Sequence, residues 1–319
     1  MKKILAFAVA AVLACAGLVV QAEQTRAEKL RAKLDSNDRS YVFVTMHRGD
    51  WRHAPENSSA AILGSIAMGA DIVELDVAPT KDGHYVLLHD GALDRVSNGK
   101  GKAIDMTLAE IKKFRLKDEK TGETTAYEIL TLEEAFALTR GKILVNLDKY
   151  ARDPKGVTDL AVRLGVEREI VFKSELSPKE LKDALGDELW GMFLSKRLFY
   201  MPIVRLYKPQ PMEVVKGWLA CGRAPDAFEI CFHDEKDLSV MQMLAAKPLP
   251  SSRIWINTLW DAKPDWDVLC GTHTDERGHD GDPDGSWGWC IKQGATMLQT
   301  DRPEDLIPYL KSTGHHTLD

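Results

Sequence analysis

Short apolar runs recur along the chain and alternate with stretches that have helical periodicity. Apolar runs of this length, bounded by turn residues and separated by helical segments, are typical of parallel β-strands that are buried on both faces. Such strands, joined by crossover helices, favour an α/β fold and specifically a (β/α)8 TIM-type barrel. The pattern predicts the strands Val42–Met46, Ile72–Val77, Ile143–Asp148, Glu169–Lys173, Leu189–Leu194, Ala227–Cys231, Arg253–Asn257 and Thr296–Gln299.

Two helices are indicated near the start of this series. Residues 24–38 are rich in Lys, Arg, Glu and Leu, which predicts an amphipathic helix that leads into the first strand and abuts the bottom of the barrel. Asn57 and Ser58 predict the cap of a second helix, which ends at Gly69.

The region after the second strand departs from the regular alternation. Asp82-Gly83 between strand-like residues predicts a two-residue β-hairpin that sets Asp76 opposite His89. Residues 100–130 contain many Lys and Glu residues, and we interpret them as a small surface insertion or lid.

Several predicted strands end in polar residues that a buried strand would not normally carry. Residues two apart in an extended chain point the same way, so Glu74 and Asp76 share one face and can bind one cation. Their apolar neighbours imply burial on both sides, and buried carboxylates need a partner charge or a metal. Since catalytic groups gather at the carboxyl ends of barrel strands, we expect one site there. Its candidate residues are His47, Arg48, Glu74, Asp76, His89, Asp148 and Lys149.

Each of these residues also has an ordinary structural interpretation. A single histidine after a strand is usually a surface or hydrogen-bonded group, and paired carboxylates on an edge strand are usually solvated. The joint occurrence of histidines, an arginine and carboxylates on separate strand ends favours a catalytic constellation over these alternatives.

Specific motifs recur in a fixed order around these residues. They are His47-Arg48-Gly49, Pro55-Glu56-Asn57, Glu74-Leu75-Asp76, Lys81-Asp82-Gly83 and His89-Asp90, followed by Asp94-Arg95, Asn98-Gly99-Lys100-Gly101, Leu130-Thr131-Leu132-Glu133-Glu134 and Gln299-Thr300-Asp301-Arg302-Pro303. In their order and spacing these motifs resemble the glycerophosphodiester phosphodiesterase family. The resemblance spans roughly residues 41–312.

The resemblance implies a metal-dependent phosphoric diester hydrolase that converts glycerophosphodiesters to an alcohol and glycerol phosphate. It implies one divalent cation held by Glu74, Asp76 and, by position, Asp148, with His47 and His89 as acid and base. Ligation by three carboxylates favours Mg²⁺ or Ca²⁺ over zinc. The planar guanidinium of Arg48 suits a phosphate.

The chain departs from the family pattern at the third acid. Many family members carry Glu there and a Lys two residues later, whereas here Lys149 follows Asp148 at once. Adjacent residues face opposite ways unless the strand has already ended, and on that condition Lys149 is a phosphate ligand. Arg52 is a candidate second guanidinium for the phosphate, although a surface loop explains Asp50-Trp51-Arg52 equally well.

Other polar residues are weaker candidates. Lys173 could meet phosphate, Glu229 lies within a predicted strand, and Trp255 is better explained by barrel packing than by stacking on glycerol. The segment Asp261–Ser286 has enough oxygen ligands for a second calcium site, but Asp, Gly and Pro are also the residues of exposed turns, which we favour.

Composition limits the partners. The 319 residues carry a net charge of −6 and no basic stripe with interleaved aromatic residues, which argues against nucleic acid. A small-molecule phosphodiester must therefore be attracted by local Arg, Lys and metal charge. The sequence leaves the oligomeric state open.

The first residues predict export. Lys2-Lys3 precede an apolar run from Ile4 to Ala14 and a Val20-Gln21-Ala22 cleavage site, so residues 1–22 are expected to be a signal peptide. The run is short for a membrane span. Leu13 before Ala14 is unusual for lipoprotein processing, so we favour cleavage after Ala22 over a lipid anchor at Cys15. The product is then periplasmic or secreted, with an N-terminal helix region at 23–40 and one barrel domain at 41–312.

Four cysteines remain after such cleavage. They allow three complete pairings, among them Cys270 with Cys290 and Cys221 with Cys231, and free buried thiols are equally compatible. No Cys-x-x-Cys spacing is present, which argues against a structural zinc site.

Two other functions remain open from the sequence. The same barrel could cleave a bulkier diester, such as a lysophospholipid or a phosphoinositol headgroup, in the manner of phospholipases. A non-catalytic exported phosphodiester-binding protein is the third possibility, and release of alcohol on addition of Mg²⁺ or Ca²⁺ distinguishes it from the enzymes.

Overall fold

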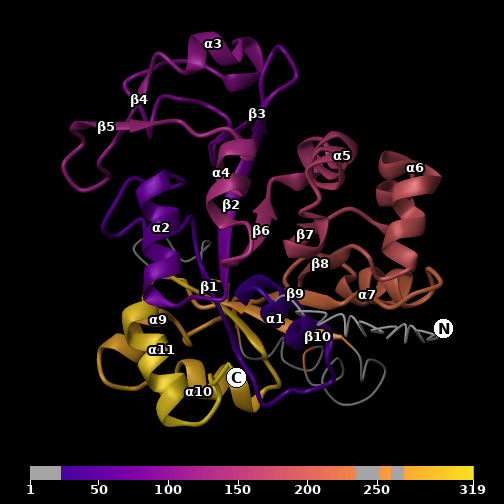
Figure 1. Cartoon of the computed structure of the whole chain (residues 1–319). Helices are drawn as coiled ribbons and strands as arrows, with labels where there is room; N and C mark the ends of the chain where they lie inside the picture. Colours follow the sequence, from indigo (N-terminus) through magenta and orange to yellow (C-terminus); the bar gives the residue numbers. More distant parts are fainter. Residues whose placement is uncertain (1–22, 235–240, 242–251, 260–268, 319) are drawn as a thin grey trace, which may run out of the picture.

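A closed barrel of parallel strands forms the centre of the molecule. The computed structural model describes residues 23–234, 241, 252–259 and 269–318. The strands follow one another around the barrel in the order β1, β2, β6, β7, β8, β9, β10 and β11, and β11 pairs with β1 to close it (Figure 1). Their bounds are β1 Phe43–Met46, β2 Ile72–Pro79, β6 Leu144–Asp148, β7 Ile170–Ser174, β8 Phe199–Arg205, β9 Ala227–Cys231, β10 Arg253–Asn257 and β11 Met297–Thr300. The predicted TIM-type barrel is confirmed.

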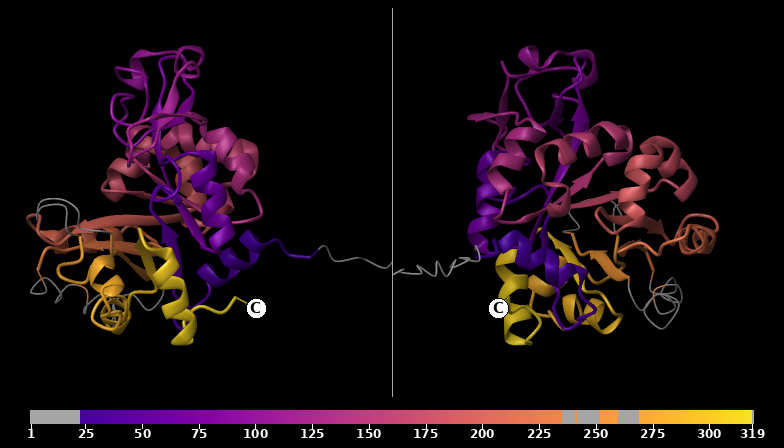
Figure 2. Two further views of the ribbon diagram at one scale, coloured as in Figure 1. Left: turned by 90° about the vertical axis from the view of Figure 1, so that its left-hand side faces the viewer. Right: turned by 45° about the vertical axis from the view of Figure 1, so that its right-hand side comes forward.

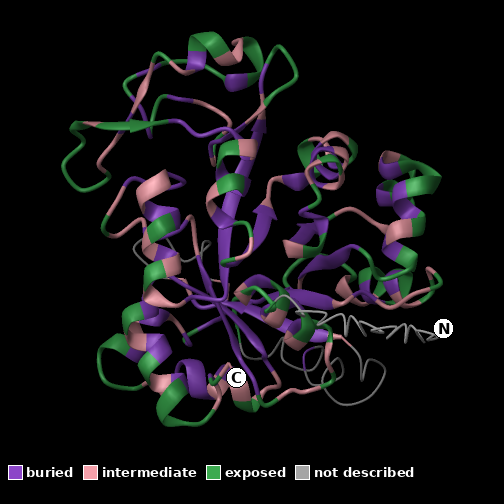
Figure 3. Ribbon diagram, in the orientation of Figure 1, coloured by how far each residue is buried: buried purple, intermediate pink, exposed green. Residues whose placement is uncertain are grey.

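The outer layer consists of helices, most of which connect successive strands, while the C-terminal helix follows the last strand. Each buries one side against the barrel and exposes the other, whereas the strands are buried along almost their whole length (Figure 3). The helices are α2 Ser59–Met68, α4 Leu132–Thr139, α5 Pro154–Leu164, α6 Pro178–Leu194, α7 Pro211–Leu219, α9 Asp275–His279, α10 Trp287–Lys292 and α11 Pro303–Ser312, with the short 3₁₀ turns η2 Tyr150–Arg152 and η3 Glu167–Glu169. As expected, α2 is capped by Ser58 and ends at Gly69, whose φ of 82° is accessible to glycine at little cost.

One predicted strand is wrong. Residues Leu189–Leu194 form the last turns of α6, and the fifth barrel strand is β8, which begins at Phe199. Helix α6 begins with a capping box between Ser177 and Glu180, and Leu181, Leu185 and Leu189 are buried at intervals of one helical turn. A short apolar run at the end of such a helix cannot be told from a strand by its composition.

The hairpin after β2 exists, but its register differs from the prediction by one residue. Strand β3, Tyr85–Leu87, pairs antiparallel with β2, with Val77 opposite Leu87 and Pro79 opposite Tyr85. The connecting loop runs from Thr80 to His84 instead of being a two-residue turn, and the Leu88 amide donates to the Asp76 carbonyl at 3.0 Å. Asp76 therefore lies opposite Leu88, and His89 follows the end of the pairing.

The expected insertion after the second strand is a small unit with its own sheet and core. It contains η1 Ala103–Asp105, α3 Leu108–Ile111 and the antiparallel strands β4 Arg115–Lys117 and β5 Thr124–Glu128. Figures 1 and 2 show this unit beyond the end of β2, projecting from the barrel. Its apolar residues form a cluster separate from the barrel core, made of Ala78, Val86, Leu88, Leu93, Val96, Ala103, Ile111, Leu116 and Ile129.

Helix α1, Arg26–Asp35, covers the amino-terminal end of the barrel, as predicted. Its buried face packs Ala27, Leu30 and Leu34 against the first residues of several strands, including Phe43 and Leu144. Within the described residues, no helix has both the length and the apolar composition needed to cross a membrane. Cys221, Cys231, Cys270 and Cys290 are in thiol form in the described part of the chain, so neither of the disulfides considered above is present.

Arg253 joins α1 to the barrel. This β10 residue is 1% exposed, and its guanidinium donates to the carbonyls of Leu34 at 2.9 Å, Lys33 at 2.7 Å, Asp38 at 3.0 Å and Ser36 at 3.2 Å. Lys33 and Leu34 belong to the last turn of α1, and Ser36 and Asp38 follow it, so Arg253 donates to carbonyls at a helix end, where the intrahelical hydrogen bonds run out.

We expect Arg253→Met to lower the free energy of unfolding by about 3 kcal/mol, because it leaves buried carbonyls without donors. The measurement is urea unfolding followed by circular dichroism. Arg163→Met, on the exposed side of α5, is the matched control and should change the stability by less than about 0.5 kcal/mol. Equal losses in the two variants would contradict the role given to Arg253.

Candidate active site

Three carboxylates meet at the carboxyl ends of two neighbouring strands. Glu74 and Asp76 come from β2 and Asp148 from β6, and Asp76 and Asp148 are register partners. One ligand oxygen from each lies within 4.8 Å of the other two. Glu74 and Asp76 are almost fully buried, and the side chain of Asp148 is 25% exposed. The sequence prediction that Glu74 and Asp76 share one face of their strand is therefore correct.

The carboxylate cluster suits an oxygen-ligated cation. The Asp76 Oδ1 atom is buried and has no hydrogen-bond partner, while its Oδ2 accepts from Asn57 Nδ2 at 3.0 Å. Burial, together with the charge of Asp76, raises the pKa of Glu74 to about 7. Negative charge crowded in this way is relieved by a bound divalent cation, and three carboxylates are the hard ligands that Mg²⁺ and Ca²⁺ prefer.

Arg48 lies against this cluster in an unusual backbone conformation. Its φ is 53°, its amide donates to Glu74 Oε2 at 2.9 Å, and its Nε lies 3.7 Å from Asp76 Oδ2. The Nη1 atom donates to Glu56 Oε2 at 2.9 Å. The guanidinium is thus fixed at the edge of the cluster by acids on two sides.

Lys149 lies just past the end of β6, which is the condition under which the sequence allowed it to face the phosphate. Its φ of 58° is left-handed, so the strand ends at Asp148 and the lysine turns back over that residue. Lys149 Nζ lies 3.1 Å from Asp148 Oδ2, and its amide donates to Asp148 Oδ1 at 2.8 Å. Burial raises the pKa of Asp148, but the charges of Lys173 and Lys149 outweigh this and hold it below its usual range.

Lys173 lies inside the barrel beneath the carboxylates. It is 4% exposed, and its Nζ lies 3.2 Å from Glu229 Oε2 and 5.5 Å from the centre of the Trp255 ring. Burial lowers the pKa of Lys173, but Glu229, Asp148 and Glu74 raise it further, so the amine stays charged. Trp255 is fully buried, as its packing interpretation predicts.

His47 is oriented by an acid from the last strand. Its Nδ1 lies 3.0 Å from Asp301 Oδ1, which also accepts from Trp51 Nε1 at 2.5 Å. The Asp301 amide in turn donates to Asp275 Oδ2 at 2.7 Å. Burial lowers the pKa of His47, but the charge of Asp301 outweighs this, so the net shift is upward.

His89 has a different environment. Its Nδ1 lies 2.7 Å from Asp90 Oδ1, and its carbonyl accepts from Arg152 Nη2 at 3.0 Å. Burial lowers the pKa of His89. The negative charge of Asp76 raises it by less, so the net shift is downward. The two histidines are therefore shifted in opposite directions, which is the arrangement expected of an acid and base pair.

Some residues of the site had no role assigned from the sequence. Asp301 was noted only within a motif, and its contact with His47 joins residues far apart in the chain, which no local pattern reveals. Glu56 is buried and accepts from Arg48 and from both terminal nitrogens of Arg95 at 2.8 Å. The Pro-Glu-Asn motif was the available signal for Glu56.

The remaining sequence candidates have no recorded contact with the three carboxylates in the described part of the chain. Arg52 Nε lies 3.9 Å from Glu304 Oε1 of α11. In the segment Asp261–Ser286, residues 261–268 lie outside the described part of the chain. Elsewhere, Glu74, Asp76 and Asp148 form the one cluster of three potential metal ligands among described residues, so a second calcium site gains no support.

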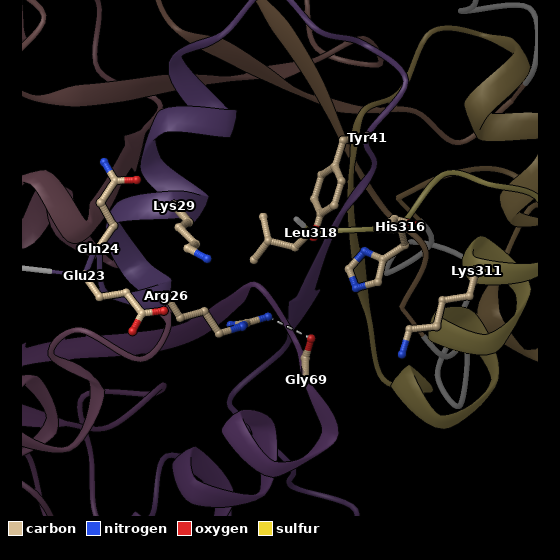
Figure 4. A pocket seen from close by; sticks show the side chains of 10 residues that line it. Glu23, Gln24, Arg26, Lys29, Tyr41, Gly69, Lys311, His316 and Leu318 are labelled. Carbon is tan, nitrogen blue, oxygen red and sulfur yellow. Dashed lines mark hydrogen bonds between the residues drawn. The ribbon is translucent and has the colours of Figure 1, made fainter.

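A cavity of about 710 Å³ lies at the opposite end of the barrel from the carboxylates, between α1 and the C-terminal tail (Figure 4). Its lining contains none of the residues described above: it consists of Glu23, Gln24, Arg26, Lys29, Tyr41, Gly69, Lys311, His316, Thr317 and Leu318. This cavity is large, but the carboxylate cluster and the two histidines are not part of its lining.

Two family models match different halves of the barrel. Residues 47–172 match the Glycerophosphoryl diester phosphodiesterase family, and residues 200–310 match a domain of unknown function. The first match covers most of the motifs identified in the sequence and ends within β7, although the resemblance was expected to continue to residue 312.

Curated relatives match the same first half. A glycerophosphodiester phosphodiesterase of Caldanaerobacter subterraneus is 49% identical over 109 residues, which are 34% of this chain and 44% of that protein. The mouse glycerophosphodiester phosphodiesterase 1 is 40% identical over 103 residues, 30% of each chain. The chain thus spans less than half the length of these relatives.

Solved structures share the whole fold at lower identity. A glycerophosphoryl diester phosphodiesterase of Parabacteroides distasonis has a TM-score of 0.66 at 24% identity, with 90% of this chain and 92% of that chain covered. A phosphodiesterase of Oleispira antarctica, solved with the product sn-glycerol-3-phosphate, has a TM-score of 0.58 at 18% identity over 84% of this chain and 96% of its own.

We expect Ca²⁺ or Mg²⁺ to raise the thermal unfolding midpoint of the wild-type chain, because an ion that binds only the folded state stabilises it. Asp76→Asn should abolish most of this rise, since it removes the ligand oxygen that has no other partner. Asp159→Asn, an exposed acid on α5, is the control and should keep the full response. An unchanged response in Asp76→Asn would contradict the metal site.

Proposed function

We propose that the chain, whose residues 47–172 match the Glycerophosphoryl diester phosphodiesterase family, is a member of that family and hydrolyses glycerophosphodiesters to an alcohol and glycerol phosphate. The observation that carries this proposal is the buried trio Glu74, Asp76 and Asp148 at the carboxyl end of the barrel, with Arg48 and Lys149 beside it. The product named in the Oleispira structure is consistent with the same reaction class.

The phosphate would be held by positive charge at the rim of the carboxylate cluster. Arg48 offers the planar fork that suits two phosphate oxygens, and Lys149 offers a compact charge from the neighbouring strand end. Arg52 is a further candidate from the same loop as Trp51. Since the chain is acidic overall, this local charge is what attracts an anionic diester.

Glu74, Asp76 and Asp148 would hold one divalent cation, Mg²⁺ or Ca²⁺, which when bound acts as a Lewis acid toward the phosphate oxygens. Arg48 and Lys173 then balance the remaining negative charge of the three acids. This balance supports the ligand set, because an uncompensated buried carboxylate would otherwise become protonated.

His47 and His89 would transfer the protons. Asp301 fixes the ring of His47 through Nδ1, and Asp90 fixes that of His89 in the same way, so each histidine keeps its Nε2 for the substrate. Because their pKa values move apart, one imidazole is protonated while the other is neutral over a range of pH. Such a pair removes a proton from the attacking oxygen and protonates the leaving alcohol.

We expect the purified chain to release alcohol from a glycerophosphodiester in the presence of Mg²⁺ or Ca²⁺, and a chelator to abolish the release. His47→Ala and His89→Ala should each lower kcat by about 10²–10⁴, since each removes one proton-transfer group. His84→Ala, an exposed histidine in the hairpin loop, is the control and should keep wild-type activity. Near-normal turnover in either catalytic variant would refute the assignment, and no release by the wild type would favour a binding protein.

Export to the periplasm or medium is also part of the proposal. It is supported by the sequence of residues 1–22, which lie outside the described part of the chain.

We expect the mature protein to begin at Glu23, because the Val20-Gln21-Ala22 segment has the small residues that signal peptidase requires. Intact-mass measurement of the chain recovered from the periplasm and medium tests this. A mass that retains residues 1–22, or a lipid attached to Cys15, would contradict it.

A further inference from the structure

A second cavity lies between the insertion and the loop that precedes α2. Its volume is about 290 Å³, close to the lower end of the range for small-molecule sites. One wall comes from the barrel loops, with Pro55, Glu56, Arg95 and Val96, and the other comes from the insertion, with Lys117, Asp118, Glu119 and Gly122.

This cavity adjoins the carboxylate cluster through shared residues. Glu56 lines the cavity and accepts from Arg48 Nη1 at 2.9 Å, and the Nε of the same arginine lies 3.7 Å from Asp76 Oδ2. Asn57, the next residue, donates to Asp76 at 3.0 Å. Glu56 thus links the cavity lining directly to Arg48, the proposed phosphate ligand.

Most of the charge in the lining is already paired. Arg95 donates to Asp90 at 2.8 Å, to both oxygens of Glu56 and to Glu119 Oε1 at 3.0 Å. Asp118 Oδ1 accepts the amides of Lys120 and Thr121 and so closes its own turn.

Two groups from the insertion can contact a ligand in this cavity: Lys117, and Glu119, which keeps its ion pair with Arg95. Lys117 is half-buried in the lining, and within the described residues no ion pair involves its Nζ, which offers three donors. Glu119 is 33% exposed, and burial and the neighbouring Glu56 raise its pKa to about 7. Near neutral pH its carboxyl group can thus both donate and accept hydrogen bonds.

We propose that Lys117 and Glu119, together with Arg95, form a subsite for a polyhydroxylated leaving alcohol, such as the inositol or glycerol of a glycerophosphodiester. The proposal rests on the proposed function and names the substrate class that this chain prefers. Each hydroxyl group both donates and accepts, so adjacent hydroxyls match a lining that offers ammonium, guanidinium and carboxyl groups.

The same lining disfavours the other common headgroups. A quaternary ammonium group is recognised by aromatic rings, and the cavity wall contains none. An anionic headgroup would face the carboxyl groups of Glu56, Asp118 and Glu119. The apolar part of the wall, Pro55 and Val96, suits the carbon face of a polyol ring.

The test compares glycerophosphoinositol with glycerophosphocholine as substrates of the full-length mature chain. We expect the wild type to prefer the inositol ester. Lys117→Ala and Glu119→Ala should each raise KM for it about tenfold with kcat nearly unchanged, because a contact made equally in the ground and transition states is lost. Glu119→Gln should restore most of the affinity, since an amide also donates and accepts.

The controls separate this subsite from folding and from the proposed function. Lys113→Ala changes an exposed lysine of the same insertion that does not line the cavity, and should leave both substrates unaffected. In every variant, unchanged KM and kcat for the choline ester show that the fold and the catalytic centre are intact.

Two results would overturn the subsite while leaving the proposed function in place: a wild type that prefers the choline ester, or alanine variants that alter KM for both esters equally or for neither. A wild type that cleaves no diester at all would overturn the proposed function, and the subsite with it.

Discussion

The burial of three carboxylates at one end of the barrel is the constraint on which the rest of the site depends. Glu74, Asp76 and Asp148 lie too close to carry their charges without compensation, and the chain surrounds them with cations from separate segments. Arg48 follows β1, Lys149 follows β6, and Lys173 stands inside β7. Buried charge is costly unless it is paired, and the closed barrel is what brings these cations from separate strands to the three acids.

The sequence predicted the features that are local. The parity of Glu74 and Asp76, the cap of α2 and most strands follow from alternation and capping rules that act over a few residues. The strand assigned to Leu189–Leu194 failed because a short apolar run has the same composition at the end of a helix. The hairpin register failed because the loop from Thr80 to His84 is longer than its Asp-Gly pair suggested.

Other features could not have been found from the sequence, because they depend on closure of the barrel. The contact of Asp301 with His47 exists only because β11 pairs with β1. Likewise, the ion pair between Lys173 and Glu229 spans β7 and β9, with β8 between them. Local sequence patterns predict which side chains lie at the ends of strands. The residues that orient those side chains come from other strands of the barrel, far away in the sequence.

The two halves of the barrel therefore contribute differently. The half matched by the phosphodiesterase family model carries the carboxylates, Arg48 and both histidines, and it ends one residue before Lys173. The second half supplies Asp301, which contacts His47, Asp275, which accepts from the Asp301 amide, and Glu229, which pairs with Lys173.

The backbone at Arg48, Asn57 and Lys149 carries a further consequence. All three adopt positive φ, a region that costs a non-glycine residue on the order of 1–3 kcal/mol. A glycine would relieve this strain at each position, but it would also remove the side chain that contacts the acids. At these three positions a substitution that raises thermal stability would thus weaken the proposed active site. Stabilising substitutions should therefore accumulate elsewhere in the barrel.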